Sequence, residues 1–400
     1  MSYITYQEAI ARLQPQGKAK SKGIPSITYY GDLEDETIYI FTAGKEAILS
    51  PSDDELPAVI GRFDADGVNE IPPAMAAWMQ EMAREIYFKS IPLPANAKAP
   101  AKVVKAAATV ERKTVQPLIK ATWNQGAPYN QGLTFDGKSV IVGCNAVAIG
   151  MILLYWAKKG YRRGCTATKA YTSKTAKYKV PALEHVKVFD FDNMTYSKPS
   201  TAKQKKAVAD MLRHIGYALK SDYTPNGTLA YMGDVVTVFK TYLRFGNPKR
   251  IYANKGYDVF ERQIYEELAA GRPVIMAGYT VNGAGHTFLC DGYDAARDMY
   301  HINWGWSGQC NGYFRMSALD ATAARAYDSN KVAIVGIGKD THILGDVNGD
   351  GEVSITDAMA VMEAAASGKT DPKYDVNSDG KVTVEDANAI VEHVMGVQKL

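Results

Sequence analysis

Apolar residues along the chain follow two spacings, and their order predicts a mixed fold. Residues 73–88 read PAMAAWMQEMAREIYF, with apolar side chains three and four positions apart, which predicts an amphipathic helix. A more continuously apolar run at 145–157 predicts a buried helix. Other helices are predicted at 6–13, 358–366 and 387–395, and strands at 37–42, 47–50, 273–276, 287–289, 299–303 and 333–337. Because helices precede strands within 121–340, this region is expected to be an α+β domain.

The composition is that of a globular protein with more than one domain. A chain of 400 residues exceeds a usual single core, and 46% of its residues are hydrophobic and 22% charged. No apolar run approaches the ~20 residues of a membrane span, and no basic stripe interleaved with aromatic residues suggests nucleic-acid binding. The first residues, Met1-Ser2-Tyr3, do not begin a signal peptide. The protein is therefore either cytosolic or secreted with its signal peptide absent from this sequence.

Charge is unevenly distributed behind a formal net charge of +3. Residues 345–400 carry eleven acids and four bases, a net of −7, so the rest of the chain carries +10. Residues 93–120 hold six bases and one acid, with few bulky apolar side chains before Val115. This pattern predicts an exposed tether, the kind of segment that proteases cut. The alternative is an ordinary interdomain linker.

The acidic tail contains a repeat, DVNGDGEVSITD at 346–357 and DVNSDGKVTVED at 375–386. Oxygen-bearing side chains fall at positions 1, 3, 5, 9 and 12, with glycine at position 6, as in calcium loops, where the carbonyl at position 7 adds a ligand. Two copies in register, each followed by a predicted helix, favour two structural calcium ions over solvated turns. The predicted ligand residues are Asp346, Asn348, Asp350, Glu352 and Asp357 in one loop, and Asp375, Asn377, Asp379, Lys381 and Asp386 in the other.

The tail differs from an EF-hand, because position 12 is aspartate and no helix precedes either loop. Its order of loop, helix, linker, loop and helix over 345–396 resembles a dockerin module. The resemblance implies a small α-helical module, calcium-dependent folding and binding to a cohesin-type receptor. The receptor-facing loop positions 10 and 11 would be Ile355-Thr356 and Val384-Glu385. Because these pairs differ, the two copies are not expected to be interchangeable.

One of the four cysteines stands where a nucleophile would be activated. Cys144 immediately precedes the apolar helix at 145–157. Free N–H groups and the positive end of the helix dipole at such a position favour the thiolate, which is the reactive form. The alternative is a buried free cysteine without chemical function. No CxxC pair is present, which argues against a zinc site.

Three further motifs could complete a site around this cysteine. In WNQGAPYN, the Gln125 amide could join the Cys144 N–H in stabilising an oxyanion. In GAGHTFLCDGYD, His286 opens a predicted strand after a glycine-rich stretch and could act as the base. In HINWGWSG, Asn303 could orient the imidazole and Trp304 could shield the pair from water.

Other candidate residues receive non-catalytic interpretations. The remaining cysteines lack a helix start and are predicted to be structural or incidental: Cys165, Cys290 and Cys310. His301 lies beside the Asn-Trp motif but has the alternate facing on its strand. Asp291 and Asp294 flank the histidine strand and are interpreted as turn residues.

In the order Gln, Cys, His, Asn-Trp, these motifs resemble papain-like cysteine peptidases. WNQGAPYN, the cysteine helix ending in Tyr155-Trp156, GRPVI, GHTFLCDGYD and HINWGWSGQCNGYF resemble the streptopain family more closely, over about 120–340. The resemblance implies a papain-like fold of two subdomains and catalysis without a cofactor. It implies these roles: nucleophile, Cys144; base and acid, His286; oxyanion donor, Gln125; orienters, Asn303 and Trp304. The chain departs from the family at Val142 and Asn145, where threonine-type and small or β-branched residues are common.

The N-terminal region resembles the pro-domain of streptopain-like zymogens, though more loosely. The implied organisation is a pro-domain that inhibits its own peptidase at 1–92, a basic linker with the maturation site at 93–120, a peptidase at 121–340 and the dockerin-like module at 345–396. A separate binding domain is the alternative for the first part. The expected protein is a secreted or cell-surface cysteine endopeptidase acting on proteins or peptides. A cell-wall peptide amidase with the same dyad and a non-enzymatic surface adhesin are the alternatives.

Overall fold

The computed structural model describes residues 8–9, 38–43, 45–54, 56–66, 68, 71–90, 112–255, 257–279, 285–317, 331–339, 344–348, 353–377, 379–398 and 400. The helix predicted at 6–13 lies outside these ranges, except for Glu8 and Ala9, which are helical. Most of the predicted tether, 93–111, also lies outside them. Within the described ranges, no helix combines the length and apolar character that crossing a membrane requires.

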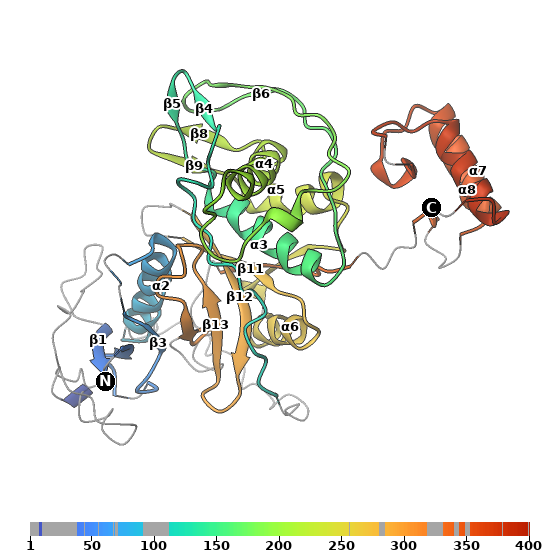
Figure 1. Ribbon diagram of the computed structural model, residues 1–400. Helices are drawn as coiled ribbons and strands as arrows, with labels where there is room; N and C mark the ends of the chain where they lie inside the picture. The colour runs from blue at the N-terminus through green and yellow to red at the C-terminus, as the bar shows by residue number, and fades with distance from the viewer. Residues whose placement is uncertain are drawn as a thin grey trace, which may run out of the picture.

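One nine-stranded antiparallel sheet joins the N-terminal region to the middle of the chain, in the order β1-β2-β3-β14-β13-β12-β11-β15-β10 (Figure 1). Its strands are β1 Ile38–Ala43, β2 Glu46–Pro51, β3 Gly61–Asp64, β10 Lys249–Tyr252, β11 Val274–Tyr279, β12 Gly285–Asp294, β13 Met299–Asn303, β14 Gly312–Phe314 and β15 Val332–Val335. The junction is the β3–β14 pair, in which Tyr313 lies opposite Arg62. The N-terminal strands therefore extend the central sheet through backbone hydrogen bonds.

The helices lie around this sheet and in a separate C-terminal unit. The α-helices are α2 Pro73–Ser90, α3 Cys144–Lys158, α4 Ala202–Ala218, α5 Met232–Thr237, α6 Tyr257–Ala269, α7 Ile355–Ala366 and α8 Val384–Val394. Short helical turns are η2 Phe191–Asn193, η3 Val238–Tyr242, η4 Ala253–Lys255 and η6 Pro372–Tyr374. Three small hairpins pair β4 Thr134–Phe135 with β5 Lys138–Ser139, β6 Tyr171–Thr172 with β7 Lys179–Val180, and β8 Asp222–Thr224 with β9 Gly227–Leu229.

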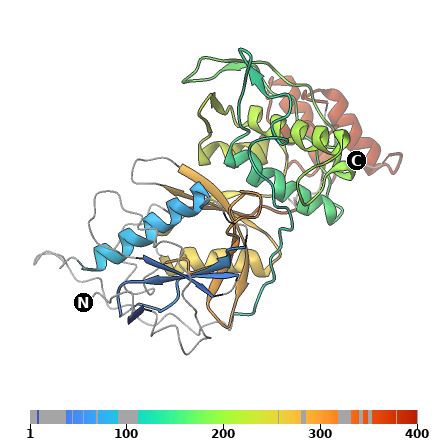
Figure 2. The same ribbon diagram turned by 60° about the vertical axis from the view of Figure 1, so that its left-hand side comes forward.

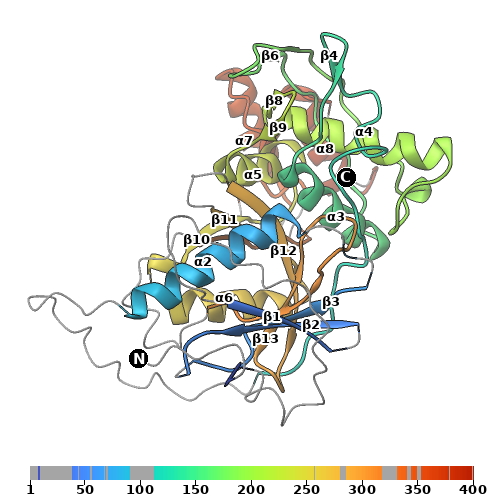
Figure 3. The same cartoon turned by 90° about the vertical axis from the view of Figure 1, so that its left-hand side faces the viewer.

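The two faces of the sheet belong to different apolar cores. Val274 and Met276 of β11 pack in one core with residues of α2 and α6. The alternating residues Ile275 and Ala277 pack in the other core with α3 and α4. Side chains alternate between the two faces of a strand, so of two consecutive residues one faces α2 and the other faces α3. Figure 3 shows α2 running across the sheet beside β11 and β12, with α3 beyond them.

Most of the predicted elements are present, with extended ends. The amphipathic helix at 73–88 corresponds to α2, the apolar helix at 145–157 to α3, and the strand at 299–303 to β13. Thirteen of the fifteen residues in α3 are buried, which explains its nearly continuous apolar sequence. The prediction missed α4 and α6, in which charged residues interrupt the apolar pattern. It also placed β12 at 287–289, whereas the strand covers 285–294.

Residues 112–120 are not the exposed tether that their composition predicted. Val115 and Tyr293 exchange two backbone hydrogen bonds of 2.8 Å, and the N–H of Leu118 donates to the carbonyl of Asp291. This edge of β12 is open because β11 pairs only as far as Cys290. The segment therefore fills a position beside the sheet, and only residues before Arg112 can match the predicted tether.

Asp291 is also not a turn residue. It lies in β12 beside a β-bulge, is fully buried, and accepts a 2.7 Å hydrogen bond from the N–H of Ile119. Its other oxygen lies 2.6 Å from Nδ1 of His301. Asp294 is the last residue of β12, and its carboxylate accepts from the backbone N–H of Ala296 in the turn that follows.

The C-terminal unit has its own small core between α7 and α8. Its buried apolar residues are Val347, Ala358, Val361, Val376, Ala387 and Ile390. Figures 1 and 2 show this unit on the side of the molecule away from α2 and the N-terminal strands. It is therefore a compact module attached to the central region rather than part of the nine-stranded sheet.

Candidate active site

The candidate nucleophile Cys144 is the first residue of α3, and the backbone there requires glycine just before it. Gly143 has φ +91°, and a Cβ at this position would lie 3.0 Å from Cγ2 of Thr228. Gly143 caps the helix without a side-chain hydrogen bond. The first N–H groups of a helix have no acceptor within it, and those of Cys144 and Asn145 face the Cys144 thiol, where an oxyanion would form.

Thr287 of β12 lies against the thiol of Cys144. Its hydroxyl donates a 2.7 Å hydrogen bond to Oδ1 of Asn145, and Nδ2 of Asn145 donates a 2.9 Å bond to the carbonyl of Ala230. Burial raises the pKa of the Cys144 thiol, while polar contacts with the backbone and hydroxyl of Thr287 act in the opposite direction. Burial outweighs these contacts, so the protonated thiol is favoured in this arrangement.

His286 lies on the other side of β12. Its cross-strand partner is Gly278, where a Cβ would lie 3.9 Å from Cβ of Ala77 and 4.0 Å from the N atom of Trp78, both in α2. Thr287 pairs instead with Ala277, which belongs to the core of α3. Because directly paired residues share a face, His286 projects toward α2 and Thr287 toward Cys144. Burial on the α2 side lowers the pKa of His286, which favours neutral imidazole.

The backbone of Gln125 is bound to the segment that leads into the nucleophile. Its carbonyl accepts a 3.1 Å hydrogen bond from the N–H of Val142, two residues before Cys144. Its own N–H donates to Oδ1 of Asn124, whose Nδ2 donates to the hydroxyl of Ser307. These bonds hold the Gln125 backbone between the start of α3 and the loop after β13.

Asn303 and Trp304 occupy opposite faces of the sheet. Asn303 is fully buried, its Nδ2 donates to the carbonyl of Ala121 at 2.9 Å, and its Oδ1 accepts from the N–H of Gly305 at 3.1 Å. It pairs with Leu289 in the α3 core and so shares the face of Thr287. Trp304 instead belongs to the α2 core, with its ring 5.0 Å from Phe288 and 6.4 Å from Trp78 between centroids.

The structure thus brings Cys144, Gln125 and Asn303 to the α3 side of the sheet and leaves His286 and Trp304 on the α2 side. Among the described residues, no hydrogen bond joins His286 to Cys144 or to Asn303. Sequence reasoning missed Thr287 and its bond to Asn145, since neither residue type is typical of nucleophilic catalysis. The departure at Asn145 from the family pattern was the one available signal.

The four cysteines are unpaired with one another, and Cys165, Cys290 and Cys310 are buried.

The two repeats of the tail close in the same way. The N–H of Asn348 donates to Oδ1 of Asp357 at 3.0 Å, and the N–H of Asn377 donates to Oδ1 of Asp386 at 3.0 Å. Loop position 12 thus returns to position 3 in both copies. Burial alone would raise the pKa of Asp357, but hydrogen bonds from Asn348, Ser354 and Val347 bring it below its ordinary value.

Carboxylates of the second loop accept hydrogen bonds from backbone N–H groups of the same loop. Asp375 accepts from the N–H groups of Asp379 and Gly380, and Asp379 accepts from the N–H of Lys381. This all-oxygen donor set fits calcium. The predicted ligands Asp350 and Glu352 lie outside the described residues, and within the described part no three acidic, histidine or cysteine side chains form a metal cluster.

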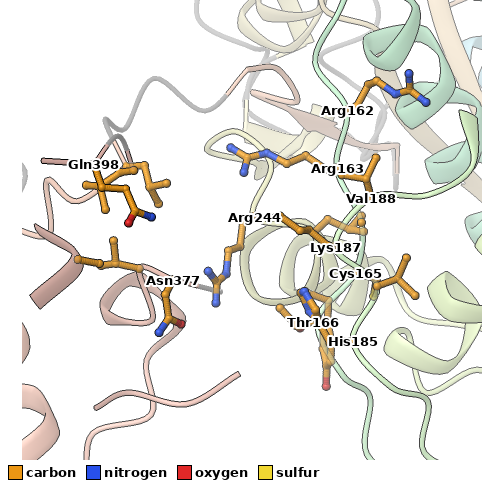
Figure 4. Close-up of a pocket in the computed structure, with 18 residues that line it drawn as sticks. Arg162, Arg163, Cys165, Thr166, His185, Lys187, Val188, Arg244, Asn377 and Gln398 are labelled. Carbon is orange, nitrogen blue, oxygen red and sulfur yellow. The ribbon is translucent and has the colours of Figure 1, made fainter. Parts of the chain in front are cut away.

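A basic surface of the central region contacts this second loop. Arg244 donates through Nη2 to Oδ2 of Asp375 at 2.6 Å and through Nη1 to its carbonyl at 2.7 Å. Beside this contact lies a cavity of about 420 Å³, with Arg162, Arg163 and Lys187 on the central side and residues of the module on the other. Figure 4 shows Arg244 reaching across toward Asn377.

Comparisons with known proteins match two families. Residues 123–314 match the peptidase C10 family, and residues 344–395 match the dockerin type I domain. The chain is 25% identical over 379 residues to streptopain of Streptococcus pyogenes, covering 84% of this chain and 89% of streptopain. It is 24% identical to the thiol protease/hemagglutinin PrtT of Porphyromonas gingivalis, covering 83% of this chain and 41% of that protein.

The fold has a solved counterpart. A mutant of prointerpain A from Prevotella intermedia superposes with a TM-score of 0.63 at 24% identity, covering 77% of this chain and 98% of that structure. This likeness confirms the papain-like α+β fold predicted for the peptidase. The chain is therefore a cysteine peptidase whose residues 123–314 form a streptopain-like peptidase C10 domain and whose residues 344–395 form a dockerin type I domain.

Proposed function

We propose that this cysteine peptidase is a secreted endopeptidase made as a zymogen, with Cys144 as nucleophile and His286 as general base and acid. The observation that carries the proposal is the position of Cys144 at the open N-terminus of α3, directly beside the strand that bears His286. The Gln125 carbonyl bonds to the N–H of Val142, two residues before Cys144, which supports its proposed role as oxyanion donor. The similarity to streptopain and the dockerin domain support an extracellular or surface location.

In the active arrangement, His286 takes the thiol proton and Cys144 Sγ attacks the carbonyl carbon of the substrate. The resulting oxyanion accepts hydrogen bonds from the Gln125 side chain and the Cys144 N–H. His286 then gives its proton to the leaving amine, and the C–N bond breaks to leave a thioester. Water, deprotonated by His286, attacks the thioester carbonyl, which releases the carboxylic acid product and restores the thiol. Asn303 would orient the imidazole and Trp304 would shield it.

The N-terminal region, residues 1–92, would keep this site inactive. Its helix α2 packs directly on Gly278, the cross-strand partner of His286, and its Trp78 reaches Trp304. With α2 in place, His286 lies on the side of β12 away from Cys144. Removal of the region would free that side. The maturation cut would fall between α2 and Arg112, because residues 112–120 are held against the sheet.

Casein cleavage tests this proposal. The full chain should cleave casein only after its N-terminal region is removed, and a thiol-directed epoxide should block cleavage. Cys144→Ala and His286→Ala should each abolish it. Cleavage of cell-wall peptides in place of casein would favour the amidase alternative. If the processed chain cleaves neither substrate, the peptidase assignment of this site is wrong.

The dockerin domain would bind two calcium ions and dock to a cohesin-type receptor. Its helix α7 presents an exposed apolar row at three- and four-residue spacing, with Ile355 48%, Met359 64% and Met362 52% exposed. Val384, the counterpart of Ile355 in the second copy, is 54% exposed. EDTA should lower the helix content of the isolated module in circular dichroism, and an unchanged signal would contradict the calcium loops.

A further inference from the structure

Thr287, rather than the neighbouring His286, is the residue of β12 that meets the nucleophile. Its hydroxyl donates to Oδ1 of Asn145, the residue after Cys144, at 2.7 Å. Only 4% of either side chain is exposed. A buried hydrogen bond of this kind is costly to leave unmade, because neither group can turn to water instead.

Asn145 is itself fixed on its other side. Its Nδ2 donates to the carbonyl of Ala230 at 2.9 Å, in the segment between β9 and α5. One amide thus joins three parts of the peptidase: the start of α3, the strand of the base, and the loop before α5. With Asn145 held in this way, its Oδ1 offers a fixed acceptor to whichever residue of β12 faces it.

The fixed acceptor selects the face of the strand. Adjacent residues of a strand point to opposite sides, so Thr287 and His286 cannot both face Cys144. Asn303, the proposed partner of the imidazole, lies on the Thr287 side. Assembly of the dyad therefore requires His286 to reach the side that Thr287 now occupies, which needs a local rearrangement at the start of β12.

We infer that Asn145 and Thr287 are positioning residues whose hydrogen bond holds β12 with Thr287 against Cys144, and that this bond breaks when the enzyme is activated. The inference rests on the proposed roles of Cys144 and His286. The Asn145–Thr287 hydrogen bond would be a second restraint on activation, in addition to the contact with α2, and it lies inside the peptidase domain. The restraint should slow activation even where the N-terminal region is loosened.

The test compares Thr287→Val, which removes the hydroxyl at nearly constant shape, with Thr287→Ser, which keeps it. In the uncleaved full chain, the rate at which iodoacetamide labels Cys144 is measured by mass spectrometry, together with the rate of self-processing. Thr287→Val should raise both rates about threefold to tenfold, which corresponds to the free energy that one hydrogen bond contributes. Thr287→Ser should stay near the parent. In the processed enzyme, Thr287→Val should give no comparable acceleration of labelling.

Asn145→Ala removes the same bond from the other partner. The double variant with Thr287→Val should label no faster than the faster single variant, because only one interaction is lost. Equal labelling of the Thr287→Val and parent full chains, or full additivity in the double variant, would overturn the inference. Labelling reports on the restraint without substrate turnover. Failure of the processed parent to cleave casein would instead contradict the proposed function.

Discussion

Cys144 and His286 lie on opposite sides of strand β12 in this structure. Thr287 meets the thiol, while His286 faces α2 across from Gly278. Burial raises the pKa of Cys144 and lowers that of His286, so both groups are favoured in their neutral forms. A thiolate–imidazolium pair is therefore disfavoured while α2 is docked.

This arrangement predicts how thiol reactivity depends on pH. In the full chain, labelling of Cys144 should be slow at neutral pH and should rise only as the pH exceeds the ordinary thiol range. After removal of residues 1–111, an imidazolium beside the thiol should lower its pKa, and each unit of decrease multiplies the thiolate fraction about tenfold. The pH at which the labelling rate begins to rise should therefore move toward acid values. Identical profiles before and after processing would contradict the separation of the two residues.

Glu85 of α2 and Lys331 of the peptidase region form an ion pair with 1% and 5% of their areas exposed. The other carboxylate oxygen of Glu85 accepts from the hydroxyl of Ser317 at 2.6 Å. Glu85→Gln removes the charge of this carboxylate from beside the buried ammonium, and breaking a buried pair of this kind costs roughly 3–5 kcal/mol. We expect this variant to self-process faster than the parent, as followed by gel electrophoresis.

The matched control is Glu46→Gln, which removes a partly exposed ion pair with Arg62 at the β2–β3 hairpin. Such a pair contributes about 1 kcal/mol or less. Equal processing rates for the two variants would show that the buried pair does not hold α2 in place.

The anchored segment 112–120 predicts where the mature chain can begin. Four hydrogen bonds tie it to β12, including the one from Ile119 to the buried carboxylate of Asp291. A chain that starts at Ala121 should lose about 2–6 kcal/mol of unfolding free energy relative to one that starts at Arg112. Denaturant unfolding of the two truncated chains measures this difference. N-terminal sequencing of the self-processed form should find a start at or before Arg112, and a natural start at Ala121 would contradict the prediction.

Arg244 and calcium should compete for the same carboxylate in the second loop. The guanidinium is bound to Asp375, the residue at loop position 1, through two hydrogen bonds. Arg244→Gln should therefore tighten calcium binding at this loop by about tenfold, because a charge-assisted contact no longer has to be broken. Calorimetric titration of the full chain measures the affinity, with Asp375→Asn as the control that removes second-loop binding. Unchanged affinity in Arg244→Gln would show that the contact does not oppose the ion.

The sequence by itself determined the parts of the protein that depend on local pattern. The apolar run after Cys144 predicted the helix that places this cysteine at a helix start, and α3 confirms it. The oxygen spacing of the paired loops at 346–357 and 375–386 predicted calcium loops. Their order with the helices that follow them resembles a dockerin module, and the family match confirms this resemblance. Such features are readable because a helix start or a calcium loop is encoded within about a dozen consecutive residues.

Only the tertiary structure decided what depends on distant segments. The composition of 112–120 did not indicate that the open edge of β12 would bind this segment. The sequence around Asp291 predicted a turn residue, whereas the structure shows that Ile119 and His301 contact its carboxylate. The side of β12 on which His286 lies is likewise absent from local pattern. It depends on strand register, on the packing of α2 against Gly278 and on the bond between Asn145 and Thr287, and each of these joins residues far apart in the chain.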